Sequence, residues 1–325
     1  MQALRVERLS PDLSGVALVD LPVPDPGPDG VLVRVRASSL NHPDLLMTRG
    51  TYQFRPEVPF TLGLELAGEV VSAPAGSGFA PGDRVTGGAK TGGMAQFAVL
   101  PAANLRPVPV NLSYEEAAAM GAAYSTAWTA LVEIGRLRPG QWVLVHGASG
   151  GVGLAACDLA RALGARVIAA THRADKLARI GQAVTVDAVI LNQGRFREEV
   201  ARITGGRLCD LVFDPVGGDV FDESTRCVAF GGQLQVIGFV SGRIPQVAAN
   251  IPLIKGFSLV GVRAGEYARR FPERGRAIAA AVSRLAQAGT VRPHIDRVLP
   301  LADWRTAFSA MAAGEVVGKM VLVPV

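Results

Sequence analysis

The feature that most constrains the fold of this chain is a glycine-rich run between two apolar segments. The first segment has the pattern of a strand and the second has that of a helix. Residues 142–146 form a short, mainly apolar run that ends at Gly147, as expected of a buried parallel strand. Residues 147–153 read Gly-Ala-Ser-Gly-Gly-Val-Gly, and apolar residues then recur at helical spacing until Gly164. This order predicts a strand, a glycine turn and a helix.

Such an order is typical of a unit that binds a nucleotide. Residues 165–171 add a second apolar strand, which completes a βαβ unit. Glycines at the turn let the backbone approach a pyrophosphate, and the free N–H groups and positive dipole end of the helix bind it. A tight turn without a ligand is the alternative, but the flanking strand and helix favour a dinucleotide. We expect it to contact Ser149, Gly150, Gly151 and Val152.

The end of the second strand indicates that the dinucleotide is NADPH. NAD sites usually place an Asp or Glu there to accept a hydrogen bond from the ribose 2′-OH. This chain instead has Thr171, His172, Arg173 and, one helical turn later, Lys176. A hydroxyl and two cations suit a 2′-phosphate, so we expect Thr171, Arg173 and Lys176 to bind it. Because Asp175 lies nearby, a solvated basic helix start is the alternative interpretation.

Composition places the chain among ordinary globular proteins. Its 325 residues are enough for two cores, and 49% hydrophobic residues with 38 glycines fit an α/β protein. No apolar run approaches the roughly 18 residues of a membrane helix, and the charged N-terminus lacks the apolar region of a signal peptide. We therefore expect a cytoplasmic protein with no membrane partner.

Cysteines and charges exclude other classes. The three cysteines are scattered and form no CxxC or Cys/His pair at metal-ligand spacing, so we interpret them as core thiols. The net charge of +5 comes from arginines spread along the chain, not gathered into a basic run. Attraction of an anionic cofactor explains this excess, and we do not expect nucleic-acid binding.

Strand and helix patterns divide the chain into two domains. Alternating and apolar segments at 31–36, 68–71 and 97–100 predict a β-rich first domain. A helix over 113–135, opened by a Ser113 and Glu116 capping box, leads out of it. Six strands alternating with helices then predict a doubly wound parallel sheet. These strands are expected at 142–146, 166–170, 187–191, 209–213, 233–237 and 257–262.

The last part of the chain is predicted to return to the first domain. Helices are expected over 274–288 and 303–312, followed by an apolar strand over 318–323. Because the six-stranded sheet is already complete, this strand has to pair elsewhere. The predicted organisation is one domain of residues 1–125 and 263–325 and a nucleotide-binding domain of residues 126–262.

Several motifs together resemble the medium-chain dehydrogenases/reductases. They are Asn41-His-Pro-Asp44, Arg49-Gly-Thr-Tyr52, Leu62-Gly-Leu-Glu-Leu-Ala-Gly68, Pro81-Gly-Asp-Arg-Val85, the glycine turn itself and Gly318-Lys-Met-Val-Leu322. The likeness covers essentially the whole chain and is greatest toward the zinc-free quinone oxidoreductase (zeta-crystallin-like) branch. It implies an α/β fold with a GroES-like β-rich catalytic domain and a Rossmann domain.

The residues also argue against zinc. Zinc alcohol dehydrogenases of this family carry a Cys where Asn41 stands and a His where Leu64 stands, and an amide and a leucine cannot replace thiolate and imidazole ligands. A cysteine-rich structural zinc loop is missing from the sequence as well. Reducing a quinone or an activated C=C bond needs only a hydride donor, positioning and a proton source, so it suits a metal-free site better than alcohol oxidation does.

The resemblance further implies catalytic residues. Asn41, Asp44 and Tyr52 correspond to polar residues that line the nicotinamide and substrate cleft, where Asn41 and Tyr52 would polarise the acceptor oxygen. Leu46 stands where several quinone oxidoreductases carry a tyrosine, which leaves the proton route open. The alternative is that residues 41–44 are only a turn and a helix N-cap and that Tyr52 packs in a core.

Additional cofactor residues follow from the same resemblance. Thr126 matches a threonine near the nicotinamide carboxamide, and Lys319 matches a C-terminal lysine near the cofactor or substrate, with a surface lysine beside a strand as its alternative. Four residues follow predicted strands at the carboxyl edge of the sheet, where the ligand crevice lies. They are Val216, Gly217, Gly238 and Phe239.

Two classes of function remain open at this point. One is an NADPH-dependent reductase of quinones or α,β-unsaturated carbonyls, including enoyl thioesters. The other is an NADPH-binding sensor or RNA-binding protein with little turnover. In either class the apolar sixth strand, 257–262, lies at an edge of the sheet, which predicts a homodimer.

Overall fold

A six-stranded parallel sheet forms the centre of the second of two units in the computed structural model, which describes residues 1–324. Its strand order is β11-β10-β9-β12-β13-β14, and every neighbouring pair is parallel. The strands are β9 (Trp142–Val145), β10 (Arg166–Thr171), β11 (Ala188–Leu191), β12 (Cys209–Asp214), β13 (Val228–Val236) and β14 (Ser258–Gly261). All six predicted strands are confirmed, as is the doubly wound order.

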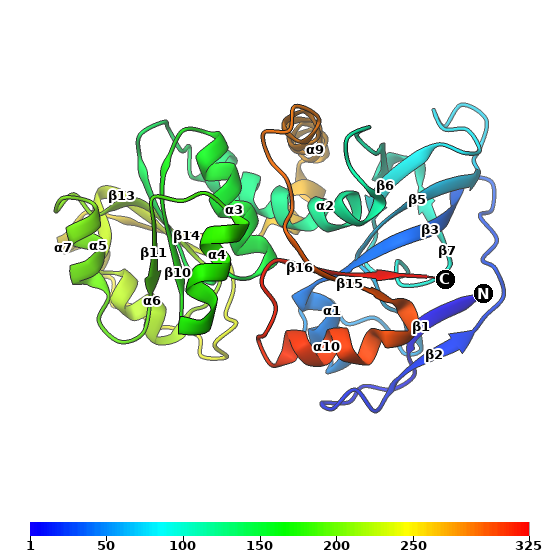
Figure 1. Ribbon diagram of the computed structural model, residues 1–325, viewed down its shortest axis with the longest axis horizontal. Coiled ribbons are helices and arrows are strands. Elements are labelled where there is room, and N and C mark those ends of the chain that lie inside the picture. Colours follow the sequence, from blue (N-terminus) through cyan, green and yellow to red (C-terminus); the bar gives the residue numbers. More distant parts are fainter. Residues whose placement is uncertain (325) are drawn as a thin grey trace. The chain divides into compact units, whose positions relative to one another are not determined.

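The inner strands are buried because both faces of the sheet are covered. Val143, Leu144 and Val145 of β9 are fully buried, as a continuous apolar run in a parallel sheet requires. Helices connect the strands (Figure 1). They are α3 (Gly151–Ala162), a 3-10 turn (Ala174–Lys176), α4 (Leu177–Ala183), α5 (Arg197–Ile203), α6 (Gly218–Ser224) and α7 (Asn250–Lys255).

The second unit, Ala123–His294, is longer than the predicted nucleotide domain. Helices α8 (Ala264–Arg270) and α9 (Pro272–Gln287) belong to it, so the chain leaves the unit at residue 294 and not at the predicted residue 262. Contacts with Glu133 hold these helices, because its Oε2 accepts from the Tyr267 hydroxyl at 3.0 Å and lies 3.4 Å from Arg274 Nη1. Helical spacing alone could not show which core α9 covers.

The first unit consists of Met1–Ala122 and Ile295–Val325, and its strands pair antiparallel except for β15 and β16, which are parallel. Its larger sheet has the order β15-β16-β3-β5-β6-β8, with β7 also paired to β3, and a smaller sheet has the order β2-β1-β4. The strands are β1 (Gln2–Val6), β2 (Val16–Asp20), β3 (Gly30–Leu40), β4 (Phe60–Thr61), β5 (Glu65–Ser72), β6 (Arg84–Gly88), β7 (Phe97–Pro101), β8 (Leu105–Pro107), β15 (Ile295–Pro300) and β16 (Lys319–Val323). Short 3-10 turns at Ala102–Asn104 and Leu301–Asp303 and helices α1 (His42–Thr48) and α10 (Trp304–Ala312) complete the unit.

The last strand pairs as the sequence predicts. Strand β16 is antiparallel to β3, with Met320 opposite Leu40 and Leu322 opposite Ser38. Figure 1 shows β16 beside β15 and β3. The side chains of Met320, Val321 and Leu322 are fully buried, so this strand completes the core of the first unit.

Helix α2 (Tyr114–Trp128) begins at the predicted capping box. Ser113 N donates to Glu116 Oε2 at 2.9 Å, and Glu116 N donates back to Ser113 Oγ at 3.2 Å. The helix continues into a π-helical turn, Thr129–Ile134, where the predicted single helix over 113–135 widens.

A buried histidine lies at the carboxyl end of β9. Ser224 Oγ donates to Val220 O at 2.6 Å, so the 2.7 Å contact between His146 Nε2 and Ser224 Oγ requires His146 to donate. The Asn192 amide donates to His146 Nδ1 at 3.0 Å. Both assignments describe a neutral ring with its proton on Nε2. Burial lowers the pKa of His146 from 6.5 to about 3.

We expect His146→Gln to weaken the loss of stability in acid. Below pH 6.5 the His146 ring is protonated in the unfolded chain but stays neutral in the folded one. The stability of the folded chain therefore falls as the pH drops toward 3. The shift corresponds to at most about 5 kcal/mol. Urea unfolding between pH 7 and pH 4 should give a shallower fall in the unfolding free energy for this variant. His172→Gln, at an exposed histidine, is the control, and equal slopes for all three proteins would contradict the assignment.

Candidate active site

The carboxylate of Glu65, the first residue of β5, is the centre of a buried polar cluster in the first unit. Its Oε1 accepts from Ser39 Oγ at 2.8 Å and from Asn41 Nδ2 at 2.9 Å, and it also lies 2.9 Å from Lys319 Nζ. Its Oε2 accepts from Ala122 N at 2.7 Å. We call Ser39, Asn41, Glu65 and Lys319 the Glu65 cluster.

The sheet brings these residues together although they lie far apart in the sequence. Strand β3 has β5 on one side and β16 on the other, both antiparallel to it. Ser39 and Asn41 lie at the carboxyl end of β3, which is the end where β5 and β16 begin. Glu65 and Lys319 are the first residues of those two strands, so the three strands place the four side chains at one edge.

The cluster contains one negative and one positive side chain, Glu65 and Lys319, which neutralise each other. Burial favours a raised pKa for Glu65, but the Lys319 charge and the hydrogen bonds from Lys319, Ala122 and Asn41 outweigh it and hold the pKa below its ordinary value. Glu65 is therefore ionised at neutral pH. Its side chain and that of Lys319 are 5% and 6% exposed, so this is a buried ion pair and not a surface contact. The alternative of a surface lysine at position 319 is wrong.

The amide of Asn41 is fully used within the cluster. Its Oδ1 accepts from Lys319 Nζ at 2.7 Å, and its two N–H groups donate to Glu65 Oε1 and to Ser39 O at 3.2 Å. This orientation is the one that sets the oxygen against the ammonium and the nitrogen against the carboxylate. Asn41 thus has no N–H left for a substrate oxygen in this structure.

Asp44 is buried beside the cluster but bonds to the backbone. Its Oδ2 accepts from Asn41 N at 2.9 Å and its Oδ1 from Gly63 N at 3.1 Å, which joins the start of α1 to the turn before β5. Burial raises its pKa from 3.8 to about 7, against the opposing effect of these two N–H groups and the Lys319 charge. The helix-start alternative for residues 41–44 therefore describes much of what Asp44 does here.

Tyr52 is separate from these groups. It is half-buried and packs against the core of the first unit, and within residues 1–324 its hydroxyl makes no hydrogen bond. The structure thus joins Asn41, Asp44 and Lys319 but does not bring Tyr52 to them. Glu65 and Ser39 were not predicted as site residues. An acidic residue inside the apolar run 62–68 was the available signal, because an isolated carboxylate is rarely buried without a partner.

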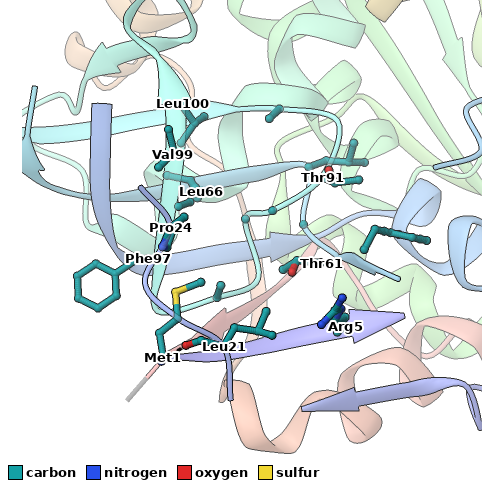
Figure 2. Close-up of a pocket in the computed structure, with 18 of the residues that line it drawn as sticks. Met1, Arg5, Leu21, Pro24, Thr61, Leu66, Thr91, Phe97, Val99 and Leu100 are labelled. Carbon is teal, nitrogen blue, oxygen red and sulfur yellow. Dashed lines mark hydrogen bonds between the residues drawn. The ribbon is translucent and has the colours of Figure 1, made fainter. Parts of the chain in front are cut away.

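A cavity of about 450 Å³ lies in the first unit, and Glu65 is one of its lining residues. Figure 2 shows Met1 and Leu21 together at one end, where Met1 N donates to Leu21 O, and it shows Arg5, Thr61 and Thr91 among mainly apolar neighbours. Its lining includes the segment 63–66, and so Glu65 of the cluster, but none of Asn41, Asp44, Tyr52 and Lys319. The cavity therefore borders the Glu65 cluster at Glu65 alone.

In the second unit, the glycine turn fits a pyrophosphate. Gly150 is exposed and is the N-cap of α3, whose first N–H groups have no partner within the helix. A Cβ on Gly153 would lie 2.3 Å from Gly147 O, so only glycine allows the helix to pack this closely on the turn. Ser149, Gly151 and Val152 are each partly exposed at the same turn, where the anion is expected.

Two further predicted segments meet at the carboxyl edge of the sheet. Val216 N and Gly217 N donate to Asp214 Oδ1 at 2.7 and 3.0 Å, which fixes the turn after β12. A Cβ on Gly217, at φ +71°, would lie 3.0 Å from the Phe239 ring, so this turn contacts the segment Gly238–Phe239 after β13. Asp214 was not predicted. Burial raises its pKa to about 6, against the two N–H donors.

The residues predicted to lie near the nicotinamide and the 2′-phosphate differ in burial and in hydrogen-bond partners. Thr126 is half-buried on α2. At the end of β10, Thr171 Oγ1 accepts from Arg173 N at 3.3 Å, and the Arg173 guanidinium donates to both oxygens of Asp175 at 3.0 and 2.9 Å. Lys176 is only 3% exposed. A 2′-phosphate at this position would have to compete with Asp175 for Arg173.

Across residues 1–324, no group of three or more His, Cys, Asp or Glu side chains is placed to hold a metal ion. None of the helices in this range is both long enough and apolar enough to span a membrane.

Comparison with known proteins agrees with this geometry. Residues 27–110 match the alcohol dehydrogenase GroES-like domain, and residues 151–281 match the zinc-binding dehydrogenase domain. A quinone oxidoreductase-like protein 2 homolog of Nematostella vectensis is 36% identical over 303 residues, covering 91% of this chain and 82% of that one.

Solved structures give the same result. A probable oxidoreductase from Mycobacterium abscessus superposes with a TM-score of 0.91 at 37% identity, covering 100% of this chain and 99% of that one. The quinone oxidoreductase of Thermus thermophilus, solved also in complex with NADPH, has a TM-score of 0.83 at 32% identity, covering 99% and 100%.

The two units and their sites define an oxidoreductase with a GroES-like domain and a Rossmann domain that binds a nicotinamide cofactor. Within that class, the chain belongs to the medium-chain dehydrogenase/reductase family, in the quinone oxidoreductase branch.

We expect Asp44→Asn to flatten the pH dependence of stability near neutrality. The folded chain keeps the Asp44 proton up to about pH 7, whereas the unfolded chain loses it near 3.8, so stability falls as the pH rises through this window. The contribution is at most about 4 kcal/mol. Thermal unfolding between pH 5 and 8 should show a smaller decrease for this variant than for Asp20→Asn at an exposed site. An unchanged slope would mean that Asp44 is ionised throughout.

Proposed function

We propose that this protein is an NADPH-dependent reductase of quinones and related activated double bonds that works without zinc. The observation that carries the proposal is the pair of sites described above: a glycine turn open to a pyrophosphate, and a buried ammonium bonded to Asn41, which stands where the resemblance implies a ligand in zinc relatives. The relatives support it, since one is named a quinone oxidoreductase and was solved with NADPH.

The chain's own residues perform binding and orientation. The bound cofactor supplies a hydride. The first turn of α3 would hold its pyrophosphate, and the adjoining turns at Val216–Gly217 and Gly238–Phe239 would line the crevice beside it. Within the neutral Glu65 cluster, the Lys319 ammonium is a fixed N–H donor in a low-dielectric environment, which is the kind of group that stabilises an acceptor oxygen as it gains electrons.

NADPH oxidation with a panel of acceptors tests this function directly. We expect turnover with small quinones and slower turnover with enals and enoyl thioesters, both unaffected by exhaustive chelation. NADPH binding without turnover on any acceptor would favour the sensor alternative. Stoichiometric zinc by elemental analysis, or loss of activity with the chelator, would contradict a metal-free site.

The preference for NADPH is expected to depend on Arg173 and Lys176. Replacing both with alanine removes charge-assisted hydrogen bonds to the 2′-phosphate, which costs roughly 1–3 kcal/mol for NADPH and little for NADH. Cofactor fluorescence titrations give both dissociation constants, with Arg195→Ala at an exposed site as the control. Because Lys176 is buried, the unfolding temperature of each variant has to be compared as well. Equal loss of affinity for both cofactors would overturn the assignment.

We also propose a homodimer formed through the edge of the Rossmann sheet. Strand β14 is the last strand of that sheet, and Leu259 on it is 40% exposed. Phe230, Leu253 and Ile254 are 89%, 80% and 73% exposed, and a Cβ on Gly256 would touch the Phe230 ring, so this ring lies against the end of α7. Paired edges would cover both the unpaired backbone and these apolar side chains.

A charge at this edge is expected to separate the subunits. Leu259→Lys should shift the sedimentation mass from about twice the 33.9 kDa chain toward a single chain, because an ammonium at a paired apolar edge is costly to bury. Val110→Lys, at another highly exposed apolar residue, is the control and should stay dimeric. A wild-type protein that sediments as one chain at micromolar concentration would show that the edge is not an interface.

A further inference from the structure

We propose that Lys319 is a catalytic residue whose ammonium donates a hydrogen bond to the acceptor oxygen that becomes negatively charged during reduction. This inference rests on the proposed function and assigns the electrophilic group of that reaction. It goes beyond what the resemblance implies for Lys319, which is only a position near the cofactor or the substrate.

Lys319 has more N–H groups than it has acceptors among residues 1–324. An ammonium has three N–H groups, and Lys319 Nζ donates to two acceptors among residues 1–324, Asn41 Oδ1 at 2.7 Å and Glu65 Oε1 at 2.9 Å. One N–H therefore remains for a ligand. The side chain is 6% exposed, so this N–H lies in a largely desolvated environment.

The neighbouring polar groups have no such donor. Both N–H groups of Asn41 are engaged, and the Ser39 hydroxyl donates to Glu65. The Asp44 oxygens accept from two backbone N–H groups. Tyr52 lies outside the cluster. Within the described chain, Lys319 is the member of this group that can still donate.

The ammonium is also held in place before any ligand binds. Two acceptors on different elements, Asn41 before α1 and Glu65 on β5, fix its position, and both are buried. A donor fixed in advance in a poorly hydrated site stabilises a developing oxyanion without reorganising, which is what a bound metal ion does in zinc enzymes. Glu65 and Asn41 are then positioning residues that act through Lys319.

The atoms and electrons of the proposed reduction balance, and Lys319 is the same before and after it. The acceptor receives a hydride, which carries two electrons and one hydrogen, from the NADPH that the proposed function supplies. Negative charge develops on the acceptor oxygen, where the Lys319 N–H stabilises it. A proton from solvent water then completes the hydroquinone or the saturated carbonyl product.

Two variants separate this role from a structural one. Lys319→Met removes the donor but leaves the Glu65 charge buried without its partner, which destabilises the fold. The double variant Lys319→Met with Glu65→Gln removes both charges and keeps the cluster neutral. Glu65→Gln alone keeps the ammonium but loosens it, and Lys90→Met at an exposed lysine is the control.

The first readout separates turnover from cofactor binding. We expect the double variant to fold, to bind NADPH within about twofold of wild type, and to lose on the order of 100-fold in kcat. Glu65→Gln should lose less. The loss should be greatest for quinones whose hydroquinones are the weakest acids, because their oxyanions need the most stabilisation. Weakened NADPH binding with normal kcat would make Lys319 a cofactor ligand and overturn the inference.

The second readout needs no turnover. A nitrophenol mimics the charged product oxygen, and its absorbance reports whether it is bound as the phenolate. We expect wild type to bind the phenolate and the double variant to bind it at least about tenfold more weakly. Equal phenolate binding would overturn the inference. If wild type reduces no acceptor, the proposed function fails, while this titration still decides whether Lys319 binds an oxyanion.

Discussion

The buried ion pair between Glu65 and Lys319 is the interaction on which the first unit's site depends. Each charge would be strongly unfavourable in the core without the other, and here the carboxylate is also satisfied by Ser39, Asn41 and the Ala122 amide. The pair joins the first residues of β5 and β16, which are separated by most of the chain. Correct pairing of β16 with β3 is therefore a condition both for closing the core and for assembling the site.

The second unit forms its site mainly from backbone groups, whereas the first unit uses charged side chains. Its anion site consists of a helix start and a turn whose glycines permit the close contact between Gly147 and Gly153. Asp214 fixes the neighbouring turn by accepting two N–H groups, and His146 fixes the end of β9 through a neutral hydrogen-bonded chain. Rigid strand ends of this kind hold loops in the positions that a dinucleotide requires.

Two residues show why motif matching alone was incomplete. Asn41 stands where zinc relatives have a ligand, and the sequence suggested that it donates to the acceptor. The structure commits its amide to Lys319, Glu65 and Ser39, which changes it from a candidate donor into a support for the lysine. Arg173 likewise has the right charge for a 2′-phosphate, but its ion pair with Asp175 makes that charge partly unavailable.

The sequence by itself determined the six parallel strands, the glycine turn, the capped helix α2 and the return of β16, because each depends on local pattern, glycine geometry or a strand left without a place in a full sheet. Only the tertiary structure decided which core α8 and α9 cover, since an amphipathic helix does not specify its partner. It also decided that Glu65 and Lys319 meet. The pairing of strands brings these two residues together although more than 250 residues separate them, and no local spacing in the sequence predicts that contact.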